Sequence, residues 1–133
     1  MIVVDAGVLA TALAVDDGDG DRARARLRGQ ALAAPELIDL EVASVFRRLW
    51  LAGQLPVRRV ELALADLREM PMRRASHAPL LWRAWELRNN VTVYDAAYVA
   101  LAEALGVVLV TADARLSRSP GLPCPVEVIG GDP

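Results

Sequence analysis

Two short runs of apolar residues, at positions 2–4 and 107–110, are unbroken and rich in β-branched side chains. Runs of this kind are typical of strands that are buried on both faces of a parallel sheet. Residues 126–129 are a third strand candidate, and residues 72–75 are a weaker one. The pattern therefore predicts four strands that are spread along the chain.

Between these strands the apolar residues recur three and four positions apart, which is the spacing of helices with one buried face. Proline and glycine mark several of the ends, since proline is tolerated in the first turn of a helix and glycine just past the last. The predicted helices cover residues 7–14, residues 19–28, the segment that follows Ala34-Pro35 and stops at Gly53, the segment that Pro56 opens, the segment from Pro79 to about Arg88, and the segment from Asp95, as its N-cap, to Gly106.

The order of these elements, with helices between successive strands, predicts an α/β fold with a mostly parallel sheet. The chain has 133 residues, which is the length of one ordinary domain. Neither an internal repeat nor a linker divides it. We therefore expect a single domain over residues 1–133.

The composition excludes several classes of protein. Apolar residues make up 54% of the chain, but charges or turn residues interrupt every apolar run, so no membrane span is expected. The first residues lack the basic leader and the cleavage-site pattern of a signal peptide. Cys124 is the only cysteine, so no internal disulfide can form. These features predict a cytoplasmic protein that does not contact a membrane.

Four acidic residues lie where an open α/β sheet binds its ligands, which is outside the carboxyl ends of the strands. Asp5 ends the first predicted strand, and Asp113 lies just past the strand at 107–110. Asp95 begins the helix before that strand, and Glu41 borders the apolar stripe of its own helix. A charge at that border faces the interior or a cleft, where it is costly unless it is paired.

A divalent cation would offset the cost of grouping such carboxylates, which otherwise repel each other and take up protons. Mg²⁺ and Mn²⁺ prefer oxygen ligands, and one or two carboxylates, waters and substrate phosphate often hold them. An ion bound in this way orients a phosphodiester, activates water and neutralises developing charge. The acids favour this chemistry if they meet in space.

Each acid also has an ordinary structural interpretation, and periodicity alone leaves both open. Asp95 could serve only as an N-cap, and Asp113 could cap the turn that follows it. Asp5 could be a loop acid, and Glu41 could pair with Arg47 or another basic residue.

Three segments carry a more specific signal than the acids alone. Residues 2–9 (Ile-Val-Val-Asp-Ala-Gly-Val-Leu) open the chain, and residues 34–45 hold Glu41. Residues 93–102 (Val-Tyr-Asp-Ala-Ala-Tyr-Val-Ala-Leu-Ala) lead into residues 111–116 (Thr-Ala-Asp-Ala-Arg-Leu). In this order and spacing they resemble the PIN-domain family and, within it, the VapC toxins of type II toxin–antitoxin systems. The resemblance spans nearly the whole chain.

The resemblance implies a three-layer α/β/α sandwich in which the four carboxylates form one catalytic and metal-binding cluster. The residues of this cluster are Asp5, Glu41, Asp95 and Asp113. Thr111 matches a position whose hydroxyl steadies the site by hydrogen bonding. Family members commonly carry Ser, Thr or Asn where this chain has Gly7.

The family further implies a Mg²⁺-dependent endoribonuclease, with Mn²⁺ as the alternative ion, that cuts tRNA or ribosomal RNA at few sites. It also implies a homodimer and a cognate antitoxin that inhibits the enzyme. Such an antitoxin lays a C-terminal segment across the acidic site.

RNA needs positive groups near an acidic site, although the net charge of −2 argues against a large basic surface. Arg115, two residues after Asp113, is the arginine best placed to contact RNA. The other candidates are Arg22, Arg24, Arg26, Arg28, Arg47, Arg48, Arg73 and Arg74. We expect Trp50, Trp82 and Trp85 in the core or at a dimer contact rather than as platforms for bases.

Three other classes of protein share parts of this pattern. A receiver-type signalling domain has the same α/β plan but needs adjacent acids after its first strand and a late lysine, and this chain has no lysine. A phosphatase of the haloacid dehalogenase type needs Asp-x-Asp where this chain has Asp5-Ala6-Gly7. A PIN-like module that binds RNA or protein with little cleavage is the third alternative. The retained acids argue against it, and Gly7 argues for it.

Overall fold

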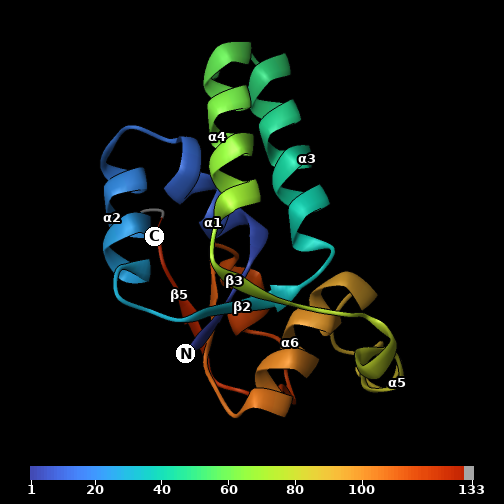
Figure 1. The fold of residues 1–133 in the computed structure, drawn as a ribbon. Helices are drawn as coiled ribbons and strands as arrows, with labels where there is room; N and C mark the ends of the chain where they lie inside the picture. Colours follow the sequence, from blue (N-terminus) through green and yellow to red (C-terminus); the bar gives the residue numbers. More distant parts are fainter. Residues whose placement is uncertain (131–133) are drawn as a thin grey trace.

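The computed structural model describes residues 1–130, in which five parallel strands form one sheet with the order β3-β2-β1-β4-β5 (Figure 1). The strands are β1 (Ile2–Val4), β2 (Leu32–Pro35), β3 (Met72–Ala75), β4 (Leu109–Thr111) and β5 (Val126–Val128). The last three residues of the expected domain, 131–133, lie outside the described residues. The predicted α/β fold with a parallel sheet is confirmed.

The second strand corrects the prediction, which assigned no strand to the residues before the helix that follows Ala34-Pro35 and so missed β2 altogether. All four of its residues are buried, and β2 pairs with β1 on one side and β3 on the other. Alanine and proline have little intrinsic preference for strands, so the local sequence gave no signal. Its two neighbours in the sheet make this segment a strand. The strand predicted at 107–110 likewise begins two residues later, at Leu109.

Helices cover both faces of the sheet. The helices are α1 (Ala6–Ala14), α2 (Gly18–Leu27), α3 (Ile38–Leu51), α4 (Val57–Glu69), α5 (Ala78–Glu86), α6 (Val93–Leu105) and the single turn α7 (Ala114–Ser117). The first four pack against each other through α1, whereas α5 packs on α6, and α6 lies against the central strands. Figure 1 shows the α3–α4 hairpin extending from one side of the sheet and α5 and α6 on the other. The result is the expected three-layer sandwich.

The core lies between α1, α3, α6 and the three central strands. Phe46 is its largest fully buried side chain. Helix α6 is buried at every position from Ala96 to Ala102, and four of these seven residues are alanines, so the helix approaches the sheet closely. Gly106, with φ of +66°, ends α6 in the left-handed conformation that glycine adopts without strain. Among residues 1–130, no helix is long and apolar enough to cross a membrane.

The three tryptophans lie on the surface of this chain, so their expected placement in the core is wrong. Trp50 is 49% exposed, Trp82 78% and Trp85 55%. They lie on α3 and α5, on faces that the described residues 1–130 leave largely open to solvent. The alternative of a dimer contact stays a prediction.

Truncation of Phe46 to alanine should lower the free energy of unfolding by about 3–5 kcal/mol, because it leaves a large cavity in the core beside α3, which packs on α1 and α4. Chemical denaturation monitored by circular dichroism measures this loss. Leu40→Ala, on the same helix but 77% exposed, should change stability by less than about 0.5 kcal/mol. Equal effects of the two substitutions would contradict the described core.

Candidate active site

The centre of the sheet is where the order of the strands reverses. From β1 the chain proceeds outward to β2 and β3, then returns to the other side of β1 to form β4 and β5. A crevice forms outside the carboxyl ends of the strands at such a reversal, and ligands bind there in open α/β sheets. Asp5 follows β1 and Thr111 ends β4, so both lie at this crevice.

Asp5 is held from three directions. Its Oδ1 accepts a hydrogen bond from the Val8 amide at 2.9 Å, which caps α1. Its Oδ2 accepts the Ala112 amide at 3.2 Å and the hydroxyl of Thr111. Thr111 is fully buried, and its Oγ1 accepts the amide of Asp113 at 3.0 Å. The first acid is therefore both a helix cap and a link between the ends of β1 and β4.

Asp113 caps the short helix α7, as its ordinary structural interpretation predicted. Its Oδ1 accepts the Arg115 amide at 2.9 Å, and Arg115 Nε lies 3.4 Å from the same oxygen. Partial burial acts to raise the pKa of Asp113, but these hydrogen bonds and the charge of Arg115 outweigh it and hold the pKa below its usual range. Asp113 thus stays ionised while it lines the crevice.

Asp95 is not the N-cap of its helix, which corrects the prediction. Thr92 caps α6, and its Oγ1 accepts the Asp95 amide at 3.2 Å. Asp95 lies in the first turn of the helix, since α6 begins at Val93. A threonine three residues before an acid competes with that acid for the cap, and the pattern alone did not decide between them. The Asp95 side chain lines the crevice.

Glu41 lies in the first turn of α3, and its partner is not an arginine. The hydroxyl of Tyr98, on α6, donates to Glu41 Oε1 at 2.7 Å. Tyr98 is only 3% exposed and was not among the predicted site residues. A usable signal was its position three residues after Asp95, which places both on one face of the helix.

One open cavity of about 490 Å³ collects all four acids, and we call it the carboxylate pocket. Its lining residues are Asp5, Ala6, Gly7, Glu41, Ser44, Val45, Arg48, Asp95, Tyr98, Ala112 and Asp113. They come from the start of α1, from α3, from the N-terminal half of α6 and from the loop after β4. The fold therefore brings together residues that are far apart in the sequence.

Burial and crowding raise the pKa values of three of these acids. For Asp5 the main cause is burial, against which the hydrogen bonds from Thr111 and two backbone amides act, with the charge of Asp95 adding to the rise. For Glu41 burial again dominates, and Asp95 and Asp5 add repulsion. Burial, followed by repulsion from Asp113, raises the pKa of Asp95. Each carboxylate would be stabilised by a cation in the pocket.

The donor set of the carboxylate pocket fits a hard divalent cation, because it offers only oxygen atoms. Among residues 1–130, however, no three acidic, histidine or cysteine side chains converge closely enough to hold an ion by themselves. An ion that uses one or two carboxylates and completes its shell with water matches this spacing, and Mg²⁺ commonly binds in that way.

Gly7 lines the carboxylate pocket without a side chain. A Cβ atom at this position would lie 3.4 Å from the Ala112 Cβ and 3.6 Å from Asp5 Oδ1, which are ordinary contact distances. A β-carbon at this position would therefore fit. As the chain stands, Gly7 presents only backbone atoms to this wall of the pocket.

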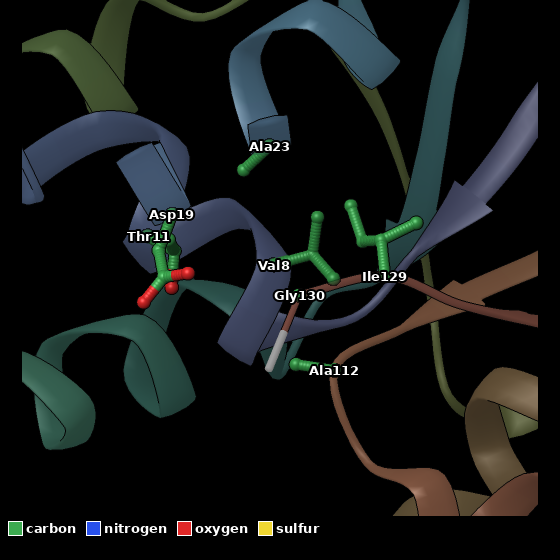
Figure 2. A pocket seen from close by; sticks show the side chains of 7 residues that line it. All are labelled: Val8, Thr11, Asp19, Ala23, Ala112, Ile129 and Gly130. Atoms are coloured by element: carbon green, nitrogen blue, oxygen red, sulfur yellow. The ribbon is translucent and has the colours of Figure 1, made fainter. Parts of the chain in front are cut away.

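A smaller hollow of about 130 Å³ adjoins the carboxylate pocket and shares only Ala112 with it (Figure 2). Figure 2 shows Val8 and Ile129 facing each other across it, with Thr11 and Asp19 together at one end. Asp19 is the only acid in this hollow, and it pairs with Arg22 on α2. The hollow therefore adds nothing to the acidic cluster.

Four of the arginines proposed from the sequence to meet RNA are engaged by partners within the protein. Arg24 donates to the carbonyls of Ala12 and Val15, and the other paired arginines bind carboxylates. These pairs are Arg22 with Asp19, Arg26 with Glu127, and Arg74 with Asp39. Arg48 and Arg115 remain exposed at the edges of the acidic cluster.

The chain belongs to the PIN-domain family, because the family model described as "PIN domain" matches residues 2–122. Among its relatives, Ribonuclease VapC1 of Mycobacterium tuberculosis is 41% identical over 128 residues, which are 96% of each chain. Ribonuclease VapC9 of the same organism is 43% identical over 129 residues, 97% of this chain and 98% of the relative. The receiver-type and phosphatase alternatives do not apply to a member of this family.

Two solved structures share the fold. VapC20 from Mycobacterium tuberculosis matches with a TM-score of 0.66 at 19% identity, over 92% of this chain and 98% of its own. VapBC2 from Rickettsia felis matches with a TM-score of 0.63 at 14% identity, over 96% and 98% of the two chains. At these identities the match shows the three-layer fold, and the VapC resemblance itself rests on the closer relatives.

Removing one charge from the pocket should stabilise the metal-free protein at neutral pH. The folded pKa of Asp95 is raised, so its contribution to stability is present below the ordinary pKa of an aspartate and is lost as the pH rises through the raised value. Asp95→Asn should therefore raise Tm at pH 7 by a few degrees in chelator, and by less near pH 4. Asp66→Asn, on the exposed face of α4, is the control and should leave Tm unchanged. A lower Tm for Asp95→Asn at pH 7 would contradict the crowding of the acids.

Tyr98→Phe should raise the pKa of Glu41 further, because the Tyr98 hydroxyl stabilises the ionised carboxylate. Carboxyl ¹³C NMR titration in chelator measures the change, and the fold should persist because only one oxygen is removed. Tyr94 is 68% exposed on the same helix, so Tyr94→Phe should leave the pKa of Glu41 unchanged. An unchanged pKa of Glu41 in Tyr98→Phe would show that the Tyr98 and Glu41 side chains do not meet in solution.

Proposed function

We propose that this protein is a metal-dependent endoribonuclease, the toxin of a toxin–antitoxin pair, that hydrolyses RNA phosphodiester bonds at the carboxylate pocket. The observation that carries the proposal is the meeting of four carboxylates from separate elements in one open cavity at the reversal of strand order. A protein gains no stability from grouping half-buried like charges, so the arrangement favours a cationic ligand.

The proposed ligands of the metal ion are Asp5, Glu41, Asp95 and Asp113, with Mg²⁺ as the ion and Mn²⁺ as its alternative. When bound, such an ion supplies Lewis-acid polarisation of the phosphodiester and lowers the pKa of water. The protein supplies the geometry. Asp5, fixed by three donors, sets the position of the first ligand, and the buried Thr111 holds it there.

Glu41 is suited to handle a proton as well as to bind the ion. Its Oε1 accepts the Tyr98 hydroxyl, and among residues 1–130 no side chain or amide donates to Oε2. Its pKa is raised by burial and by the neighbouring acids, which brings it closer to neutral pH. In the proposal Oε2 accepts the proton of the attacking water, while Tyr98 keeps the carboxylate oriented.

The relatives named ribonuclease VapC support RNA as the substrate and a toxin–antitoxin role. The proposal includes a cognate antitoxin, and the fold shared with VapBC2 agrees with this partner. It also includes a tRNA or ribosomal RNA substrate and a homodimer. The large exposed side chains on α5, among them Leu81 and Trp82, support a protein contact on that face.

With Mg²⁺ and without antitoxin, the protein should cleave structured RNA, and Asp95→Asn should reduce the rate at least about 100-fold. Replacing even a residue that only supports a metal ligand lowers metal affinity or activity about 10–100-fold, and Asp95 is itself a proposed ligand. Gel analysis of labelled tRNA and ribosomal RNA fragments measures the rates. Asp66→Asn should cleave as the wild type does.

Equal cleavage by the wild type and Asp95→Asn would place the chemistry elsewhere or reveal a contaminant. If the wild type cleaves no RNA, the function of a binding module, which Gly7 favours, replaces the proposal. Metal binding has its own readout, since Mg²⁺ should raise the Tm of the wild type but much less that of Asp95→Asn.

A further inference from the structure

A second polar cavity, of about 460 Å³, opens directly beside the carboxylate pocket, and we call it the flanking pocket. The two cavities share Asp95 and Asp113 as a common wall. The other side of the flanking pocket is formed by Arg88, Asn89 and Thr92, from the loop before α6, and by Arg115. Its volume lies within the range of about 300–1,000 Å³ that is usual for small-molecule sites.

Arg88 is held in place without being neutralised. Its guanidinium lies 4.5 Å from the centroid of the Trp85 indole, and its Nη1 donates to the Trp85 carbonyl at 3.0 Å. Within residues 1–130 no carboxylate pairs with Arg88, in contrast to Arg26 and Arg74, each of which binds an acid. A guanidinium stacked on a ring still presents N–H groups at its edge, which suit phosphate oxygens.

The loop that carries Arg88 and Asn89 is anchored at both ends. The amides of Asn90 and Val91 donate to the Leu87 carbonyl at 2.9 and 3.2 Å, which continues the turn after α5. The side-chain amide of Asn90 donates to the Pro120 carbonyl and so ties this loop to the segment after α7. The neighbouring Asn89 is exposed and lines the cavity. The wall is thus rigid, with polar groups directed to solvent.

The charges of the two cavities are complementary to a nucleic acid strand. The carboxylate pocket repels phosphate unless a cation is present, whereas the flanking pocket is lined by two arginines, Arg88 in the loop before α6 and Arg115 beside Asp113. A strand whose scissile phosphate lies at the acids must put its next phosphate to one side or the other. Only a positively charged site beside that next phosphate offsets the repulsion between it and the carboxylates of Asp95 and Asp113.

We propose that the flanking pocket binds the nucleotide next to the scissile bond, with Arg88 and Arg115 contacting its phosphate and Asn89 its base. This proposal rests on the proposed ribonuclease function and assigns that function a subsite. Asn89 can donate to and accept from a base edge through its amide. The site would therefore contribute to the choice of cleavage position.

The test compares wild type and Arg88→Ala on short oligoribonucleotides that the wild type cleaves, each full length or shortened by one nucleotide on the 5′ or the 3′ side. Arg88→Ala should lower kcat/KM about tenfold on the full substrate, mainly through KM, since a lost hydrogen bond to a charged group has about this effect. On the substrate that lacks the bound nucleotide, Arg88→Ala and wild type should be equal. Arg58→Ala, an exposed arginine on α4, should behave as wild type on every substrate.

Two measurements of RNA binding make the test independent of cleavage: the salt dependence of the affinity, and the affinity for an oligonucleotide that cannot be cleaved. The slope of log affinity against log salt should fall by about 0.7 in Arg88→Ala, because one phosphate contact to a single strand is lost. Asn89→Asp, which adds a negative charge to the same cavity, should also weaken binding of a 2′-O-methyl oligonucleotide that cannot be cleaved. Circular dichroism confirms that both variants are folded.

The outcomes separate this proposal from the function on which it rests. Loss of kcat/KM that is equal on full and shortened substrates, or an unchanged salt slope, overturns the subsite while leaving the ribonuclease intact. A wild type that cleaves no RNA overturns the proposed function. In that case unchanged oligonucleotide affinity in Arg88→Ala also overturns the subsite, and a tenfold loss supports it as an RNA-binding site.

Discussion

The carboxylate of Asp5 is the interaction on which the rest of the site depends. It accepts hydrogen bonds from Val8 at the start of α1, and from the Thr111 hydroxyl and the Ala112 amide at the end of β4. One side chain thus joins a helix to the ends of two central strands. It cannot swing away without leaving the proton of the buried Thr111 hydroxyl without an acceptor, which costs about 1–3 kcal/mol. The loop that carries Asp113 begins at this point, so the position of a second acid follows from the first.

The neighbours of the acids determine how much charge the pocket retains. Burial and mutual repulsion raise the pKa values of Asp5, Glu41 and Asp95, while donors such as Tyr98 act in the opposite direction. Arg115 acts to lower the pKa of both Asp95 and Asp113, but only at Asp113 do it and the hydrogen bonds outweigh burial. The hydrogen bonds keep the carboxylates oriented, but they do not remove the repulsion. Because of the residual negative charge, a cation is the natural ligand of this cavity. For the same reason, an RNA strand can bind here only if positively charged groups lie beside the acids.

The arginines of this chain differ in where their contacts lie. Arg24, Arg26 and Arg74 bind carbonyls or carboxylates of the protein and hold its elements together. Arg88 and Arg115 contact the Trp85 carbonyl and Asp113, and both also line the cavity that adjoins the acids. A count of basic residues therefore says little about RNA in a protein of net charge −2. RNA binding depends instead on where the fold places the few arginines that can still contact an external ligand.

The sequence by itself determined the α/β class and the placement of Asp5 and Asp113 at strand ends, because buried strands and their ends are local patterns. The resemblance to the PIN-domain family supplied the meeting of the four acids, which periodicity left open. Only the tertiary structure made residues 32–35 a strand, since pairing on both sides overrides the weak preference of alanine and proline. The tertiary structure also showed that Thr92, rather than Asp95, is the N-cap of α6, and that the Tyr98 hydroxyl donates a hydrogen bond to Glu41. These partners lie on different elements or compete within one turn, so their choice depends on packing that a linear pattern does not contain.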